Sequence, residues 1–216
     1  MRSGFRKYGR LEVWKYGNEV LESIYMDDIV LKEIPVQYNR IKDDTEKLSF
    51  QMNSDLLTGS LLKTLVASRK SGRILELGTG GGLATSWILD GMDQQTRLLT
   101  IENNAALWEI AKEQVADPRI EFLLVDGYKW LKEYQGEKFD MIFADAMPGK
   151  YDLFEETIQL LKTGGMYVID DMLPQPNWPD GHAEKADAFI HMLELRKDLI
   201  LTKLKWSTGI IIAVKK

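Results

Sequence analysis

The sequence of 216 residues contains no cysteine and only two histidines, and no apolar run is long enough to cross a membrane. Without cysteine, the chain forms no disulfides, thiolate zinc sites or cysteine nucleophile. A membrane-spanning helix needs about 20 consecutive apolar residues. The basic N-terminal residues Arg2, Arg6 and Lys7 are not followed by the apolar segment that a signal peptide requires. We therefore expect a cytoplasmic protein.

The sequence also lacks an excess of basic residues. It has 28 Lys and Arg against 33 Asp and Glu, a net charge of −5 and a pI near 5.2. This balance argues against a broad nucleic-acid-binding surface. A local basic patch could still form from the following residues: Arg2, Arg6, Lys7, Arg10, Arg40 and Lys42. With 44% hydrophobic residues the chain can bury a full core, and we expect a single domain spanning 1–216.

From residue 72 onward, segments typical of strands alternate with segments typical of helices, which predicts βαβ units and a parallel sheet. The expected strands are 73–77, 97–101, 120–125, 139–144 and 166–170. The expected helices between and after them include 105–115, 152–161 and 183–196. Residues 199–206 and 210–214, joined by a short turn with Gly209, indicate a terminal hairpin.

Residues 1–71 have helical character and are expected to form an N-terminal cap over the core at 72–216. Leu57, Leu61 and Leu65 share one helical face, and capping candidates precede them at 53–55. An earlier amphipathic helix is suggested by five apolar residues: Leu11, Trp14, Val20, Leu21 and Ile24. Trp14 and Tyr16 could serve as core anchors, as a dimer contact or as part of a lid.

The most informative segment runs from Arg73 to Gly82, where an apolar strand enters a glycine turn and then a helix. Glycines let the backbone approach a ligand closely, and the helix N-terminus offers unpaired N–H groups. Glu102 closes the next strand, at a distance suited to ribose hydroxyls. The dinucleotide pattern G-x-G-x-x-G fails, because its third glycine would fall on Leu83. A glycine turn that binds no ligand is the plainer alternative.

Acidic residues follow each of the five expected parallel strands. Ligands bind at the carboxyl ends of such strands, so these side chains should gather at one rim. The residues are Glu76, Glu102 with Asn103, Asp126 with Gly127, Asp145, and Asp170 with Asp171. Like charges crowded together require hydroxyls, amines or a cation among them. The rim therefore predicts a binding site for a cationic or hydroxyl-rich ligand.

The pattern Glu76-Leu77-Gly78-Thr79-Gly80-Gly81-Gly82 resembles motif I of class I S-adenosylmethionine-dependent methyltransferases. The segments 139–146, with Tyr151 beyond, and 167–173 look like those of the catechol and caffeoyl-CoA O-methyltransferase group. The resemblance covers roughly residue 51 to residue 216. It implies an α/β, Rossmann-like fold with a seven-stranded, mostly parallel sheet, a C-terminal antiparallel hairpin and an N-terminal helical cap.

The same resemblance implies roles for particular residues. Glu102 would bind the ribose hydroxyls, and Asp126 would bind the adenine amino group. The full expected set of S-adenosylmethionine contacts is Glu76, Gly78, Thr79, Gly80, Gly82, Glu102, Asn103, Asp126, Gly127 and Asp145. A divalent cation such as Mg²⁺ would be held by Asp145, Asp170 and Asp171, and would lower the pKa of an acceptor hydroxyl.

Two positions depart from that group. Pro148 stands where the group has a lysine near the acceptor oxygen, with Lys150 two positions further on, and Asp171 stands where the group has asparagine. Lys150 or His182 is then the candidate general base, although both could be ordinary surface residues. Trp178, in the proline-rich loop at 173–182, could stack on an aromatic acceptor.

We therefore predict an enzyme that transfers a methyl group from S-adenosylmethionine to a hydroxyl oxygen of a small aromatic acceptor, with a divalent cation assisting. A tRNA base hydroxyl is the alternative acceptor. A nucleoside-binding regulatory protein without turnover is the alternative of another class, and a nicotinamide-dependent dehydrogenase is the remaining enzyme alternative. A homodimer is compatible with each of these hypotheses.

Overall fold

A computed structural model describes residues 14–16, 19–21 and 33–216. The chain divides into two compact units, Met1–Lys32 and Glu33–Lys216, and each is described by itself. In the described residues, no helix combines the length and the apolar character needed to cross a membrane.

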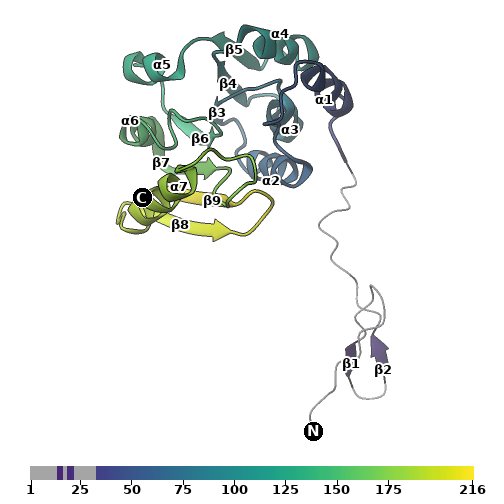
Figure 1. The fold of residues 1–216 in the computed structure, drawn as a ribbon, viewed down its shortest axis with the longest axis vertical. Helices are drawn as coiled ribbons and strands as arrows, with labels where there is room; N and C mark the ends of the chain where they lie inside the picture. The colour runs from purple at the N-terminus through teal and green to yellow at the C-terminus, as the bar shows by residue number, and fades with distance from the viewer. Residues whose placement is uncertain (1–13, 17–18, 22–32) are drawn as a thin grey trace. The chain divides into compact units, whose positions relative to one another are not determined.

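In the first unit, strands β1 (Trp14–Tyr16) and β2 (Glu19–Leu21) form an antiparallel pair in which Trp14 is opposite Leu21 (Figure 1). The prediction of an amphipathic helix is therefore wrong for these segments. Gly17-Asn18 between them is a two-residue sequence typical of hairpin turns, and the helical spacing of the apolar residues missed this signal. The expected helix positions Leu11 and Ile24 lie outside the described residues.

The second unit is built on a seven-stranded sheet with the order β5-β4-β3-β6-β7-β9-β8 (Figure 1). Its strands are β3 (Arg73–Leu77), β4 (Arg97–Glu102), β5 (Ile120–Leu124), β6 (Phe139–Ala144), β7 (Leu161–Ile169), β8 (Leu199–Leu204) and β9 (Ile210–Lys215). Strands β3 to β7 are parallel, while β9 is antiparallel to both β7 and β8. The predicted sheet and its C-terminal hairpin are confirmed.

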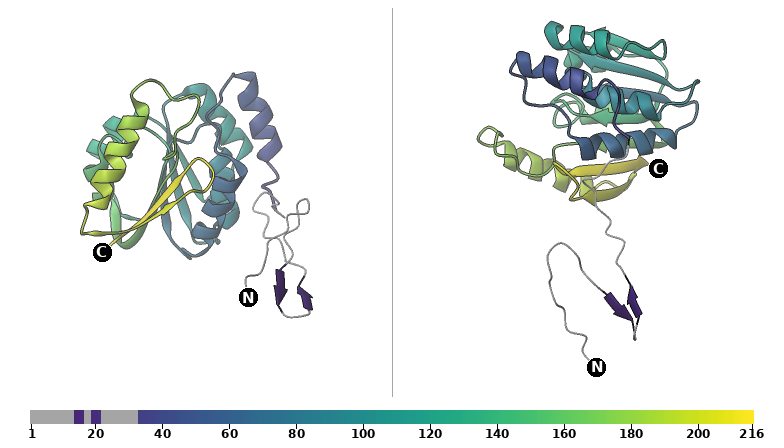
Figure 2. Two further views of the ribbon diagram at one scale, coloured as in Figure 1. Left: turned by 60° about the horizontal axis from the view of Figure 1, so that its bottom comes forward. Right: turned by 90° about the vertical axis from the view of Figure 1, so that its right-hand side faces the viewer.

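Helices lie on both faces of this sheet (Figure 2). They are α1 (Tyr38–Lys47), α2 (Leu56–Ala67), α3 (Leu83–Gly91), α4 (Ala105–Gln114), α5 (Gly127–Glu133), α6 (Phe154–Gln159) and α7 (His182–Glu194). Of the three capping candidates before α2, Asp55 is the N-cap, since its carboxylate accepts the N–H groups of Leu57 and Thr58. Helix α6 ends earlier than expected, because β7 already begins at Leu161.

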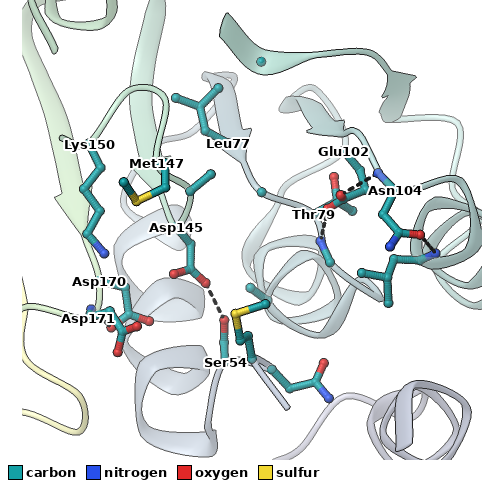
Figure 3. Close-up of a pocket in the computed structure, with 18 of the residues that line it drawn as sticks. Ser54, Leu77, Thr79, Glu102, Asn104, Asp145, Met147, Lys150, Asp170 and Asp171 are labelled. Carbon is teal, nitrogen blue, oxygen red and sulfur yellow. Dashed lines mark hydrogen bonds between the residues drawn. The ribbon is translucent and has the colours of Figure 1, made fainter. Parts of the chain in front are cut away.

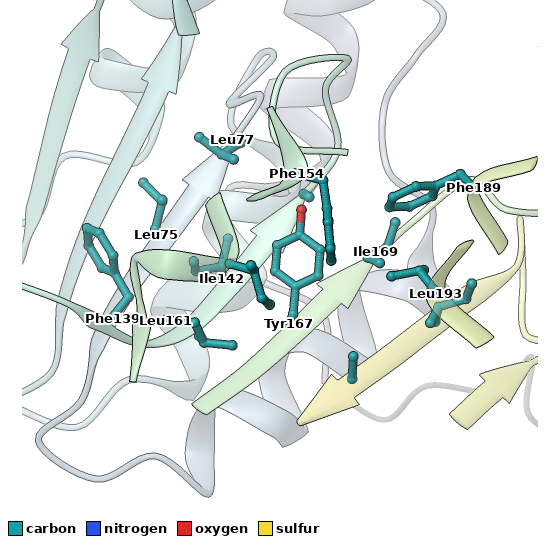
Figure 4. Packing of buried hydrophobic residues seen from close by; sticks show 14 of the residues in the cluster. Leu75, Leu77, Phe139, Ile142, Phe154, Leu161, Tyr167, Ile169, Phe189 and Leu193 are labelled. Carbon is teal, nitrogen blue, oxygen red and sulfur yellow. The ribbon is translucent and has the colours of Figure 1, made fainter. Parts of the chain in front are cut away.

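Alternation along the strands separates the core into two layers. On one face Leu75 and Leu77 pack in a cluster with α6 and α7, where Phe154 lies edge-on to Tyr167 (Figure 4). On the other face Ile74 packs in a cluster with residues of α2 and α3. Because both faces are covered, the edge formed by the carboxyl ends of the strands is where the sheet can meet a ligand.

Candidate active site

A cavity of about 760 Å³ lies at the carboxyl ends of β3, β4, β6 and β7. Its lining includes Thr79 and Glu102 on one side and Lys150 and Asp170 on the other (Figure 3). This is the edge of a doubly wound sheet at which ligands bind. The volume falls in the range of about 300–1,000 Å³ that is typical of small-molecule sites.

The glycine turn after β3 forms one wall of the cavity. Gly78 and Gly80 line it, with φ values of 96° and 53° in the left-handed region. A Cβ at Gly78 would lie 2.7 Å from the backbone oxygen of Asp145, so no larger residue fits without displacing the end of β6. Thr79 also lines the cavity, and its N–H donates to the Ile101 carbonyl at 3.1 Å.

Of the motif residues expected to contact the cofactor, Glu76 and Gly82 do not line the cavity. The fully buried Glu76 accepts hydrogen bonds from the hydroxyls of Thr85 at 2.7 Å and Thr100 at 2.6 Å. Burial raises the pKa of Glu76 to about 7, although these hydrogen bonds oppose the rise. Gly82 is the N-cap of α3 with a φ of 91°, and a Cβ there would lie 2.9 Å from the Cβ of Ala111. Both residues therefore contribute to the packing of the glycine turn and do not face the cavity.

Glu102 ends β4 and binds the glycine turn to that strand. Its carboxylate accepts the N–H of Gly80 at 2.8 Å and the N–H groups of Asn103 and Asn104 at 2.9 Å. Glu102, Asn103 and Asn104 all line the cavity, and Figure 3 shows Glu102 beside Asn104. The structure thus brings the expected ribose-binding carboxylate beside the turn.

Asp126 and Gly127 follow β5. The exposed Asp126 is the N-cap of α5, and its side chain accepts the N–H of Lys129 at 2.8 Å. Asp126 does not line the cavity, whereas Gly127 and Tyr128 do. The adenine contact expected of Asp126 stays a prediction.

Carboxylates gather on the other side of the cavity, at the ends of β6 and β7. Asp145 accepts a hydrogen bond from Ser54 Oγ at 3.3 Å, and the nearly buried Asp170 accepts one from Thr208 Oγ1 at 2.6 Å. Burial raises the pKa of Asp145 well above its ordinary value, and the charge of Asp170 raises it further. Burial likewise raises the pKa of Asp170 to about 6. Asp171 follows with a φ of 63°, in the left-handed region that Asp and Asn tolerate best among non-glycine residues.

Lys150 reaches this cluster by a local detour of the chain. Gly149 has a φ of 87°, and the segment turns back so that Pro148 forms an isolated bridge with Asp152. Lys150 is only 4% exposed, lines the cavity and points toward Asp170 (Figure 3). Its ammonium lies 5.1 Å from the ring centre of Tyr151, and no carboxylate in the described part of the chain lies within 4.0 Å of it. The loop thereby brings Lys150 into the cavity, although Pro148 stands at the earlier position.

The donor set of Asp145, Asp170 and Asp171 suits a hard divalent cation, because carboxylate oxygens are the ligands that Mg²⁺ and Ca²⁺ prefer. A cation would also offset the crowding that raises the pKa of Asp145. Within the described ranges, no three His, Asp or Glu side chains lie close enough together to form a metal-ligand group, and this includes these three aspartates. The donor chemistry of the three carboxylates nevertheless fits a hard divalent cation.

Aromatic side chains close the cavity beside this cluster. His182 begins α7, with its ring centre 4.5 Å from that of Trp178 and 5.2 Å from that of Tyr151. Burial lowers the pKa of His182, and the positive charge of Lys150 lowers it further. His182 and Trp178 line the cavity as expected, and a neutral imidazole is favoured.

Several cavity residues lie outside the expected set, among them Ser54, Tyr128 and Thr208. Ser54 comes from the approach to α2, and Thr208 comes from the turn between β8 and β9. None of the three belongs to a recognisable sequence motif. Only the three-dimensional arrangement of the segments shows that they line the cavity.

Comparison with known proteins gives a family and a fold. A sequence model of the family described as O-methyltransferase matches residues 26–206. Catechol O-methyltransferase from Mycobacterium tuberculosis is 30% identical over 121 residues, which are 53% of this chain and 54% of that protein. The chain thus spans about half the length of this curated relative.

Two solved structures share the fold. The O-methyltransferase TomG from Streptomyces achromogenes, in complex with SAM, is 24% identical with a TM-score of 0.74, covering 88% of this chain and 93% of that one. The O-methyltransferase from Bacillus cereus, in complex with SAH, is 22% identical with a TM-score of 0.74, covering 88% and 94%. At these identities the likeness shows the α/β fold alone.

Proposed function

Because the chain belongs to the O-methyltransferase family, we propose that it transfers a methyl group from S-adenosylmethionine to a hydroxyl oxygen of a small aromatic acceptor. One observation carries the proposal: a single cavity joins the glycine turn to Lys150, the carboxylates and the aromatic wall. A cofactor half and an acceptor half in one cavity are what a direct transfer between two bound molecules requires.

In the cofactor half, Gly78 and Gly80 let the backbone approach the methionine part of the ligand. Glu102 offers carboxylate oxygens to the ribose hydroxyls beside Asn103. The relatives TomG and the Bacillus cereus enzyme, described as complexes with SAM and SAH, support this choice of ligand. When bound, S-adenosylmethionine supplies an activated methyl group on a sulfonium.

In the acceptor half, Lys150 stabilises an ionised acceptor oxygen, because its ammonium is buried and has no carboxylate partner in the described residues. Burial and the charge of Lys150 lower the pKa of His182, which favours the neutral imidazole, and its nitrogen accepts the acceptor proton. Trp178 and Tyr151 provide aromatic faces that hold a planar acceptor and exclude water. Fixing the acceptor oxygen in line with the methyl group supplies much of the rate advantage.

The finer part of the proposal is a divalent cation held by Asp145, Asp170 and Asp171. Such a cation supplies Lewis acidity that lowers the pKa of a hydroxyl bound to it. The oxygen donors, and the raised pKa values of Asp145 and Asp170, support this assignment. If the cation is used, chelation should abolish turnover and leave affinity for S-adenosylhomocysteine unchanged. Full turnover in chelator would remove the cation from the proposal.

The test begins with calorimetric titration of the protein with S-adenosylmethionine and S-adenosylhomocysteine, with and without Mg²⁺, and with NAD as the comparison. Micromolar affinity for both methionine nucleosides and none for NAD is the expected result. Mass spectrometry of catechols, other phenols and tRNA after incubation then identifies the methylated acceptor. Lack of affinity for both nucleosides in a folded protein would overturn the proposal.

A further inference from the structure

Two hydroxyl groups hold the carboxylates of the site from one side. Ser54 Oγ donates to Asp145 Oδ2 at 3.3 Å, and Thr208 Oγ1 donates to Asp170 Oδ1 at 2.6 Å. In the described residues the other oxygen of each carboxylate accepts no hydrogen bond. All four residues line the cavity. Each carboxylate therefore has one oxygen fixed and one oxygen available.

The two hydroxyls belong to segments that are joined by side-chain hydrogen bonds. Asp55, the N-cap of α2, accepts hydrogen bonds from the Leu57 N–H at 2.7 Å and from Ser207 Oγ. Trp206 Nε1 donates to the Leu57 carbonyl at 2.9 Å. The first turn of α2 and the turn at 206–209 thus form one rigid support, although about 150 residues separate them in sequence. A hydroxyl on such a support fixes its partner more precisely than one on a free loop.

We propose that Ser54 and Thr208 are positioning residues, which hold one oxygen of Asp145 and one of Asp170 and leave the other oxygen of each to the cation of the proposed reaction. The inference rests on the proposed function. Hydrogen bonds to metal-ligating carboxylates typically change metal affinity by about 10- to 100-fold when they are removed. A hydroxyl that only satisfies a buried oxygen would affect folding stability and leave cation affinity unchanged.

The experiment uses the full chain with Thr208→Val and Ser54→Ala. Thr202→Val and Ser60→Ala are matched controls, because neither hydroxyl makes a side-chain hydrogen bond in the described structure: Thr202 lies exposed on β8, and Ser60 lies on α2. Thr208→Ser restores the hydroxyl. Mn²⁺ binding is measured by electron paramagnetic resonance, and S-adenosylhomocysteine affinity is measured by calorimetry in metal-free buffer.

We expect T208V and S54A to weaken Mn²⁺ binding by about 10- to 100-fold, and T208S to recover most of it. The controls should bind Mn²⁺ like the unaltered protein, and affinity for S-adenosylhomocysteine should change by less than about twofold. Circular dichroism confirms folding, and T208A replaces T208V if the valine disrupts the turn.

Mn²⁺ affinities of T208V and S54A equal to those of T202V and S60A would overturn the inference. It would also be overturned if the unaltered protein bound S-adenosylhomocysteine but no Mn²⁺, although methyl transfer would then still stand. Mn²⁺ binding that depends on Thr208, in a protein that binds no methionine nucleoside, would support the inference and overturn the proposed function alone.

Discussion

The sheet has two strand-end edges: the amino edge, where the parallel strands begin, and the carboxyl edge, where they end. Among the described residues, charged residues are paired with each other at the amino edge and crowded without such pairs at the carboxyl edge. At the amino edge, a hollow of about 220 Å³ is lined by residues that include Arg73, Arg97 and Arg119. There Arg119 pairs with Asp117, Nε to Oδ1 at 2.8 Å, and this hydrogen bond lowers the pKa of Asp117. At the carboxyl edge, burial and crowding raise the pKa of Asp145 instead.

This difference separates charges that stabilise the fold from charges held ready for a ligand. A paired carboxylate has its partner in the folded chain, so ligand binding adds nothing to it. A carboxylate that is crowded by other carboxylates, and has no ion pair in the described residues, carries a free-energy cost that a bound cation or amine can relieve. Strongly raised pKa values in a cavity are therefore an indicator of function.

The largest effect should come from removing the ammonium at the carboxyl edge. Lys150→Met is expected to lower turnover by about 10²- to 10⁴-fold, because the positive charge that we propose to face the acceptor oxygen is lost. Lys162→Met is the matched change at the amino edge, where Lys162 pairs with Asp140 at 2.8 Å. Initial rates are measured by mass spectrometry, and Lys162→Met should turn over at the rate of the unaltered protein. Equal rates for the two variants would remove Lys150 from the mechanism.

A second contrast concerns cofactor affinity. Glu102→Ala should weaken S-adenosylhomocysteine binding by about 1.5–3 kcal/mol, the loss of a hydrogen bond to a charged group. Glu121→Ala, at the hollow of the amino edge, is the matched control. Calorimetry measures both affinities, and circular dichroism checks the fold. Unchanged affinity in Glu102→Ala would show that the carboxylate serves only the glycine turn.

The pH dependence of stability should differ in sign between the edges. The folded-state pKa of Glu76 is about 7, above its ordinary value of 4.5. Its ionisation therefore costs stability, and the cost appears as the pH rises from about 4.5 to 7. Glu76→Gln should raise the free energy of unfolding by roughly 1–3 kcal/mol at pH 8, with no gain near pH 4.

Asp117→Asn should do the reverse. The folded pKa of Asp117 is lowered, so its stabilisation is present above the ordinary value of 3.8 and is lost as the pH falls through the folded pKa. Denaturant titrations from pH 3 to pH 8 measure both variants. Parallel pH profiles for Glu76→Gln and Asp117→Asn would refute the assignment of opposite environments.

The smallest contrast concerns two left-handed glycines. Gly82→Ala should cost more stability than Gly164→Ala, because a Cβ at Gly82 meets Ala111 at 2.9 Å, whereas a Cβ at Gly164 meets nothing within 4 Å. Both substitutions carry the cost of a positive φ, of order 1 kcal/mol. We expect roughly 1–2 kcal/mol between them in thermal or urea unfolding. An equal cost would mean that α4 moves to accommodate the methyl group.

The sequence predicted the sheet well because its signals are local. Apolar runs such as 73–77, followed by glycines and helix caps, define each βα unit within a few residues. The glycine turn and Glu102 were found for the same reason. The helix expected around Trp14 failed, since a few apolar residues fit a helical spacing and a short hairpin equally well.

What the sequence missed depends on long-range contacts or on one dihedral angle. Ser54 meets Asp145 from 91 positions away, and Thr208 meets Asp170 from 38 positions away. Neither contact leaves a spacing pattern in the sequence. Lys150 enters the cavity because Gly149 adopts a left-handed conformation. From the motif alone, Lys150 is only a lysine displaced by two positions.

The position of β9 has a consequence for biosynthesis. This strand follows β8 in sequence but lies between β7 and β8, so β8 has no place in the sheet until residues 210–215 have left the ribosome. Until then the edge of β7 presents unpaired N–H and C=O groups, which favour association with other chains. The hydroxyl of Thr208 also reaches Asp170 only after this pairing. Assembly of the carboxylate cluster is therefore a late event, and a nascent chain that stalls before β9 is exposed to aggregation.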